Sequence, residues 1–198
     1  TGVRPPLAGS IKLNGGVEAA GASAERLRDL GVACIPADRH GYGLAGGLSV
    51  ADNFCVGQVQ TGCYGSWLRA DQAKMRHAAE RAVNEFDVQG VRNLNQKAAL
   101  LSGGNVQKLI IAREFSRTPQ VIIAHSPSRG LDVRACAAVH ERLLKARAGG
   151  AAIVLISDDL DEVLDLSDRI GVMTRGRIAA EFNAPADRQV VGRVMVHH

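Results

Sequence analysis

Three small polar or flexible residues, Ser102, Gly103 and Gly104, stand directly before a helical pattern in the middle of the chain. The apolar residues of that pattern fall at helical intervals and indicate one buried face: Val106, Leu109, Ile110, Ala112 and Phe115. A helix N-terminus leaves backbone N–H groups unpaired and carries a partial positive charge, so it favours anions. A serine hydroxyl and two glycines that let a phosphate approach the backbone suit such a place. The pattern predicts a phosphate-facing turn, with an ordinary serine N-cap in a tight turn as the alternative.

Two other patterns fit a ligand less well. Residues 41–46 match the G-x-G-x-x-G spacing of dinucleotide sites, but no prompt helix and no acidic strand end follow them. An acidic run from Asp158 to Asp165 lacks the glycine and the ligand spacing of a calcium loop. Acidic residues in the first turns of a helix capped by Ser157 explain this run better, because carboxylates are favoured there. We therefore predict no metal site in the chain.

The elements that must position these residues alternate between helix and strand. Helices are predicted at about 23–31, 70–87, 105–117 and 134–148, and buried strands at 32–36, 120–126 and 151–157. We also expect a short strand at 9–15 with a turn at Asn14-Gly15, a glycine-rich loop at 38–50, and two strands within 168–182. The turn between these two strands is placed at 175–177. Continuously apolar strands that alternate with helices favour an α/β fold with a mostly parallel sheet.

The composition is typical of one globular domain with a sizeable core, since 46% of the 198 residues are hydrophobic. The net charge of +4 is spread along the chain, and one Trp, two Tyr and four Phe are few for base stacking, so nucleic acid is not an expected partner. The sequence has no run of about 18 apolar residues that could span a bilayer, and its N-terminus has no apolar core of a signal peptide. Any membrane role is therefore expected to go through a partner. The cysteines lack paired spacing, which favours reduced thiols and a cytosolic compartment: Cys34, Cys55, Cys63 and Cys136.

The order of motifs in the second half of the chain is highly specific. LSGGN at 101–105 is followed by an apolar strand, RGLD at 129–132, a second apolar strand ending in LISDDLDEV, and LSDRI at 166–170. This order closely resembles the nucleotide-binding domain of ABC transporters, and in particular the second, C-terminal ATPase cassette of importers for simple sugars and for nucleosides of the basic-membrane-protein type. The resemblance runs from about Thr1 to Phe182. It implies a P-loop NTPase-like α/β cassette with an inserted helical subdomain at about 51–100.

The resemblance also implies roles for individual residues. Residues 101–107 resemble the ABC signature, whose serine and glycines contact the γ-phosphate of an ATP molecule held by another cassette. The nucleotide-facing residues would be Leu101, Ser102, Gly103, Gly104, Asn105 and Gln107. Residues 128–133 resemble the D-loop region, which contributes Gly130, Leu131 and Asp132. A Pro-Glu-Asp-Arg form of the Q-loop, with alanine at the glutamate position, is matched by Pro36, Ala37, Asp38 and Arg39.

The sequence departs from that of an active ATPase at three places. No G-x-x-x-x-G-K-[ST] motif occurs, so we expect the chain to begin just beyond the P-loop helix. His125 and Ser126 stand where an active cassette has the Walker B Asp-Glu pair, and Asp158 stands at the switch-histidine position. His125 is interpreted as a partly buried histidine at a strand end, with a nucleotide contact as the alternative. Phosphoryl transfer needs a phosphate cradle, a Mg²⁺ carboxylate and a group that orients water, so this chain alone is not expected to be active.

The function implied by the resemblance is that of a peripheral ATPase cassette on the cytoplasmic face of the membrane, in a sugar or nucleoside importer. ATP and Mg²⁺ would be held mainly by a partner cassette, either the N-terminal half of the same protein or a dimer mate. The helical subdomain would dock onto the transmembrane permease subunits. Two alternatives are a binding or scaffold module without nucleotide chemistry, and an active homodimeric ATPase, which needs an upstream P-loop and still lacks the glutamate.

Overall fold

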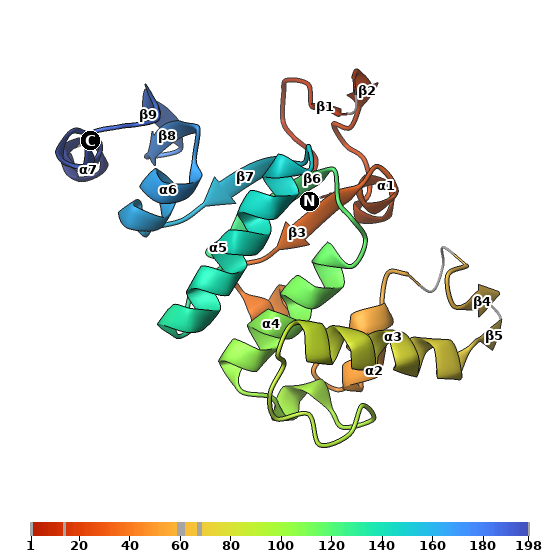
Figure 1. Ribbon diagram of the computed structural model, residues 1–198. Coiled ribbons are helices and arrows are strands. Elements are labelled where there is room, and N and C mark those ends of the chain that lie inside the picture. The colour runs from red at the N-terminus through yellow and green to blue at the C-terminus, as the bar shows by residue number, and fades with distance from the viewer. Residues whose placement is uncertain (1, 14, 59–61, 67–68, 198) are drawn as a thin grey trace.

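A sheet of three parallel strands lies at the centre of the computed structural model, which describes residues 2–13, 15–58, 62–66 and 69–197 (Figure 1). The strands follow the order β3–β6–β7, with bounds Val32–Ile35, Val121–His125 and Ala152–Ile156. Ile35 pairs with Ala124, and His125 pairs with Ile156, so all three strands end at one edge. The predicted α/β fold with parallel apolar strands is confirmed, and the residues that follow the strands are brought to a common edge.

Two long helices pack on this sheet, α4 (Gly103–Phe115) and α5 (Val133–Ala148). Val139 and Leu143 of α5 share a buried cluster with Ile111 of α4 and with apolar residues of β3 and β6. The shorter helix α1 (Ala24–Asp29) precedes β3, and α6 (Leu160–Leu166) follows β7. Helix, strand and helix thus alternate along the chain as the sequence predicted.

A second core gathers the elements between residues 50 and 100. They are α2 (Val50–Cys55), β4 (Gly65–Ser66), β5 (Arg69–Ala70), α3 (Gln72–Glu85) and the 3₁₀ turn η3 (Ala98–Leu100). Helix α3, predicted at about 70–87, buries Met75, Ala79 and Ala82. These side chains share a cluster with Leu109 and Ile110 of α4. Helix α4 therefore belongs to both cores and joins this helical region to the sheet.

Besides the antiparallel pair β4–β5 of the helical region, two further antiparallel pairs lie outside the central sheet. Strand β1 (Lys12–Leu13) pairs with β2 (Val17–Glu18), and β8 (Arg169–Thr174) pairs with β9 (Arg177–Asn183). Arg175 and Gly176 have φ values of 48° and 77°, which the tight turn of the predicted hairpin requires. No sequence prediction covered residues 188–197, which form α7 (Arg188–His197); its Val191 packs on β8. Among the described residues, no helix is both long and apolar enough to cross a membrane.

Two predictions for the first fifty residues need correction. The strand expected at 9–15 is limited to Lys12–Leu13, and Asn14 of the predicted turn lies outside the described residues. The loop expected at 38–50 contains a π-helical turn, η1 (Arg39–Gly43). This turn forms because the carboxylate of Asp38 accepts the N–H groups of His40 and Gly41.

Two helix starts also differ from prediction. Helix α4 begins at Gly103 rather than near 105, because the N–H of Val106 donates to the carbonyl of Ser102 and draws both glycines into the first turn. Helix α6 is capped by Asp159 and not by Ser157. The Asp159 carboxylate accepts the N–H groups of Asp161 and Glu162, whereas the Ser157 hydroxyl oxygen accepts only the N–H of Asp159.

Candidate functional site

The turn before α4 presents an exposed serine whose side chain does not cap the helix. Ser102 is the N-cap residue of α4, but its Oγ accepts no backbone N–H of the first turn. It accepts instead from Nδ2 of Asn105 at 2.9 Å. This contact uses a lone pair and leaves the hydroxyl proton of Ser102 available to an outside acceptor. The alternative of an ordinary serine N-cap is therefore wrong for this side chain.

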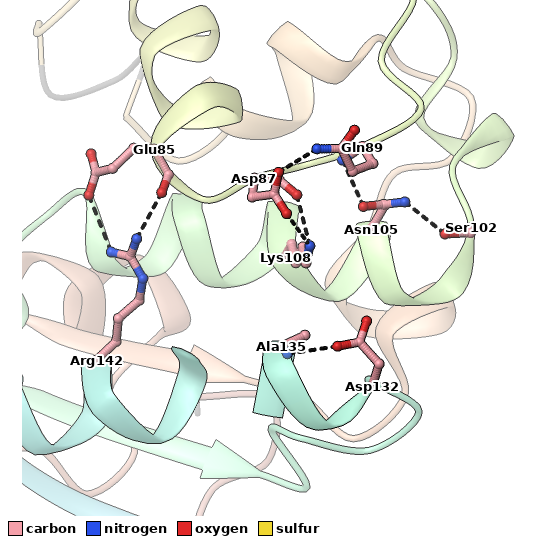
Figure 2. Close-up of polar contacts among 9 residues, drawn as sticks. All are labelled: Glu85, Asp87, Gln89, Ser102, Asn105, Lys108, Asp132, Ala135 and Arg142. Carbon is pink, nitrogen blue, oxygen red and sulfur yellow. Dashed lines mark hydrogen bonds and ion pairs between the residues drawn. The ribbon is translucent and has the colours of Figure 1, made fainter. Parts of the chain in front are cut away.

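A polar network from the end of α3 holds Asn105 in place, as Figure 2 shows. The N–H of Gln89 donates to Asn105 Oδ1 at 2.8 Å, and the side chain of Gln89 donates to the Asp87 carboxylate. Lys108 Nζ lies 2.9 Å from the Asp87 carbonyl oxygen and 3.0 Å from its Oδ2. The hydrogen bond from Lys108 lowers the pKa of Asp87. The loop after α3 thus fixes which way the Asn105 amide points.

Two residues of the predicted nucleotide-facing set lie inside the protein. Gln107 is 2% exposed, and its Nε2 donates to the carbonyl of Pro127 at 2.8 Å. Leu101 is 6% exposed and belongs to the core that α4 shares with α3. Both side chains support the turn from the protein interior. The members of the set that reach the surface are Ser102, Gly103, Gly104 and Asn105.

The loop predicted to be a D-loop lies against the same turn. A Cβ atom built on Gly104 would meet Leu131 Cδ2 at 3.7 Å and the Gly130 carbonyl oxygen at 3.8 Å. Gly130 has a φ of 71°, which favours glycine, and Asp132 caps α5 by accepting the N–H of Ala135 at 2.9 Å (Figure 2). Two sequence motifs that are far apart along the chain therefore meet at one surface.

The ends of the parallel strands carry the remaining predicted residues. His125 is the last residue of β6 and is exposed, so its interpretation as a partly buried histidine is wrong. The reason is that Ala124 is the last side chain of β6 in the core. Ser126 follows with a φ of 48°, and its N–H donates to the Ile156 carbonyl at 2.8 Å. Asp158 comes two residues after β7, at the same edge as Pro36 and the residues that follow it.

The chemistry at the end of β6 does not suit Mg²⁺. This ion prefers oxygen ligands, above all carboxylates, whereas His125 and Ser126 offer an imidazole and a neutral hydroxyl. Within the described parts of the chain, no three His, Cys, Asp or Glu residues are arranged to hold a metal ion.

The acidic run beyond β7 has structural uses. Asp159 caps α6, and the buried Glu162 lies 2.9 Å from Nε2 of His140. Asp161 pairs with Arg188 at 2.7 Å, and this hydrogen bond lowers the pKa of Asp161. Three carboxylates of the run, those of Asp159, Asp161 and Glu162, thus have partners within the protein.

Similar solved structures identify the fold of the chain. The ATP-binding cassette MJ0796, a dimer in a post-hydrolysis state with ADP and phosphate, matches 93% of this chain over 77% of its own length, with a TM-score of 0.75 and 18% identity. MJ1267, an ATP-binding cassette of an ABC transporter in its ADP conformation, matches 98% of this chain over 76% of its own length, with a TM-score of 0.64 and 20% identity. The chain has the fold of an ATP-binding cassette.

Curated relatives of this cassette are named as import proteins. It is 41% identical over 196 residues to the glucose import ATP-binding protein TsgD13 of Haloferax volcanii, and 37% identical over 183 residues to the guanosine import ATP-binding protein NupO of Bacillus subtilis. These matches cover 98% and 92% of the cassette but 36% of each relative, so it spans about a third of the length of the curated relatives that it matches. No protein-family model matches the chain. The cassette is thus related in sequence to ATP-binding proteins of sugar and nucleoside importers.

The sequence patterns did not predict the contacts that support the turn at 102–105 from other elements, although Arg39 itself was among the predicted Q-loop residues. Asp87 and Gln89 contact α4 from the loop after α3, and Arg39 reaches the predicted D-loop, where its Nη1 donates to the Arg129 carbonyl at 2.9 Å. The sequence offers one hint, because Lys108 follows Asn105 by three residues and shares its helix face. The other partners are joined only by the fold.

Proposed function

We propose that this cassette is the second, C-terminal ATPase cassette of an importer for simple sugars or nucleosides. It would supply its signature turn in trans to an ATP molecule held by a partner cassette. The observation that carries this proposal is the outward turn at Ser102, where a free hydroxyl proton lies beside the N-terminal amides of α4. The names of the relatives, a glucose and a guanosine import ATP-binding protein, support the import role.

The chemistry of the turn suits the last contacts to a phosphate. A hydroxyl proton, backbone N–H groups and the positive end of a helix all favour an anion, and hydrogen bonds to charged groups are stronger than neutral ones. The end of β6 offers His125 and Ser126 in place of a carboxylate that could bind Mg²⁺. ATP and Mg²⁺ would therefore be held mainly by the partner cassette, which is either the N-terminal half of the same protein or a dimer mate.

Docking onto the permease would use the helical region at about 51–100 and the cavity beside it. This cavity has a volume of about 740 Å³ and lies between α1, β3, η1 and the end of α4. Its walls are apolar at Leu44 and Val56 and basic at Arg28 and Arg117. A cavity of this kind supports contact with a permease segment, which would place the cassette on the cytoplasmic face of the membrane.

The test compares two substitutions of Gly104 in the full-length importer with its permease. Gly104→Ala fits, since the new Cβ would make ordinary contacts at 3.7 and 3.8 Å. Gly104→Asp adds a negative charge where the γ-phosphate must come, and this repulsion opposes closure. We expect Gly104→Asp to lower ATPase and transport by about 10²-fold, the scale of losing one preorganised contact to a developing charge. Gly104→Ala should keep most activity, and the open partner cassette should bind nucleotide equally well in both.

The outcome also separates the alternatives. An ATPase rate that survives Gly104→Asp would mean that the turn has no role in trans, and the scaffold alternative would replace this proposal. We further expect the purified chain alone to show no Mg²⁺-dependent turnover, because the loss of a water-orienting group costs about 10²–10⁴ in rate. Steady turnover that persists after contaminants are removed would favour the homodimeric ATPase.

A further inference from the structure

The guanidinium of Arg39 lies between the signature turn and the D-loop. Its Nη1 donates to the Arg129 carbonyl at 2.9 Å. A Cβ atom built on Gly103 would lie 2.9 Å from Arg39 Nη2, and one built on Gly130 would lie 3.1 Å from the same atom. The guanidinium thus fills the space that a side chain at either glycine would need.

Arg39 is held by these backbone contacts and not by an ion pair. Among the described residues, no carboxylate pairs with Arg39. The adjacent Asp38 is occupied with the N–H groups of His40 and Gly41 and so fixes the start of η1. The position of the guanidinium is therefore determined by η1 on one side and by the two glycines on the other.

The other end of η1 is tied to the helical region. The carbonyl of Gly43 accepts from Arg113 Nη1 at 2.9 Å. The side chain of Asn53 in α2, which is 1% exposed, accepts the N–H of Ala45 at 2.8 Å and donates to the Ala45 carbonyl at 2.9 Å. A continuous set of contacts therefore leads from α2 through η1 to the guanidinium of Arg39.

We propose that Arg39 is a positioning residue that couples the signature turn and the D-loop to each other and, through η1, to α2. A displacement of α2 would then move both loops together. Glycine is needed at the two adjacent positions for different reasons. Gly103 makes room for Arg39, whereas Gly104 stays open toward the surface. The consequence for ATP hydrolysis rests on the proposed function, but the mechanical coupling does not.

The coupling is tested by hydrogen exchange on the full-length protein. Arg39→Ala should speed amide exchange at Val106, the first hydrogen-bonded amide of α4, and at Arg129 and Leu131 in the other loop. The expected factor is about tenfold, as for one net hydrogen bond, and β7 should be unchanged. Arg129→Ala is the matched control, because it removes a neighbouring arginine side chain and keeps the carbonyl that Arg39 uses. Unchanged exchange at both loops in Arg39→Ala would overturn the proposal.

A double-mutant cycle tests the reason for Gly103. Gly103→Ala displaces the guanidinium, so it should slow ATP hydrolysis by the assembled importer about as much as Arg39→Ala does. The double variant should be no slower than Arg39→Ala alone. Both single variants should lower kcat and leave KM for ATP unchanged, because the partner cassette holds the nucleotide. Additive losses, or a raised KM with unchanged kcat, would overturn the positioning role.

The two proposals fail in different ways. If Gly104→Asp leaves ATPase activity intact while Arg39→Ala speeds exchange at both loops, the function in trans is wrong and the coupling stands. If Gly104→Asp abolishes activity while exchange in Arg39→Ala stays at the level of the Arg129→Ala control, the coupling alone is wrong.

Discussion

Asn105 lies in the first turn of α4, between the N–H of Gln89 and the Oγ of Ser102. Asn105→Asp keeps an acceptor for the N–H of Gln89 but loses the donor to Ser102 Oγ. A carboxylate in the first turn of α4 favours the helix by about 0.3–1 kcal/mol, so the melting temperature should hold or rise. ATPase activity of the importer should nevertheless fall, because the new carboxylate accepts a hydrogen bond from the Ser102 hydroxyl and repels phosphate. Thermal melts and ATPase assays check this. Activity at the level of the unmodified protein would show that Asn105 does not orient Ser102.

Cysteine reactivity should follow burial. Burial raises the pKa of the Cys55 thiol to about 11, whereas Cys63 is exposed. The thiolate is the reactive form, and at pH 8 roughly a thousandth of a thiol with this pKa is ionised. We expect an alkylating reagent to modify Cys63 at pH 8 and to reach Cys55 only as the pH rises toward 11. Peptide mass spectrometry measures both sites. Equal labelling of the two at pH 8 would contradict the buried position of Cys55.

The sequence predicted the turn residues but not their supports. A serine and two glycines before a helical pattern are a local signal, and the structure places them at the N-terminus of α4, with both glycines inside its first turn. Asn105 meets the N–H of Gln89, sixteen residues earlier, and Arg39 meets the Arg129 carbonyl, ninety residues later. Such contacts depend on how elements pack, and periodicity along the chain carries no information about them.

At the scale of elements, α4 is buried more completely than its pattern predicted. The predicted stripe did not include Ile111, which is 1% exposed and packs toward the sheet while Leu109 packs toward α3. Ile111→Ala and Leu109→Ala should therefore lower the free energy of unfolding by similar amounts, about 2–5 kcal/mol each. Leu100→Ala is the control, since Leu100 is 74% exposed and should change stability little. Urea denaturation measures all three. A negligible loss of stability in Ile111→Ala would mean that α4 packs firmly against only one of the two cores.

The edge of β3 shows how α4 also completes the sheet. Beyond its pairing with β6, β3 directs the N–H of Cys34 to Glu114 Oε2 at 3.2 Å. Glu114 Oε1 pairs with Arg113 Nε at 2.9 Å, and each of these side chains is 14% exposed. The last turn of α4 thus satisfies a backbone donor that would otherwise lie unpaired at a half-buried edge. The sequence predicted the strand and the helix, but the side chain that joins them was not foreseeable from either pattern.

At the scale of the whole molecule, the strands were predictable and their order was not. Apolar runs identified β3, β6 and β7, and alternation with helices indicated parallel pairing. Neighbours in a sheet are chosen by packing across helices, so the order β3–β6–β7 and the separation of the predicted β8–β9 hairpin from that sheet emerge only from the structure.

The sheet ends on an apolar strand, and this should govern how the purified chain behaves. Among the described residues, β7 has a strand on one side only, and its Val154 and Ile156 are 51% and 46% exposed. An unpaired strand edge with apolar side chains favours association with other chains. We expect the chain on its own to self-associate with rising concentration or to melt over a broad range. Light scattering over a dilution series and thermal melts measure this.

A charge placed on β7 should reduce that association. Val154→Lys puts an ammonium group on the exposed strand, where charges discourage edge-to-edge pairing. Val133→Lys is the matched control, since Val133 is 87% exposed at the start of α5, away from β7. Val154→Lys should shift the light-scattering mass toward the monomer, whereas Val133→Lys should leave it unchanged. If the unsubstituted chain is a monomer that melts sharply at every concentration, the open side of β7 does not promote association. The three-stranded sheet would then be stable without a further strand.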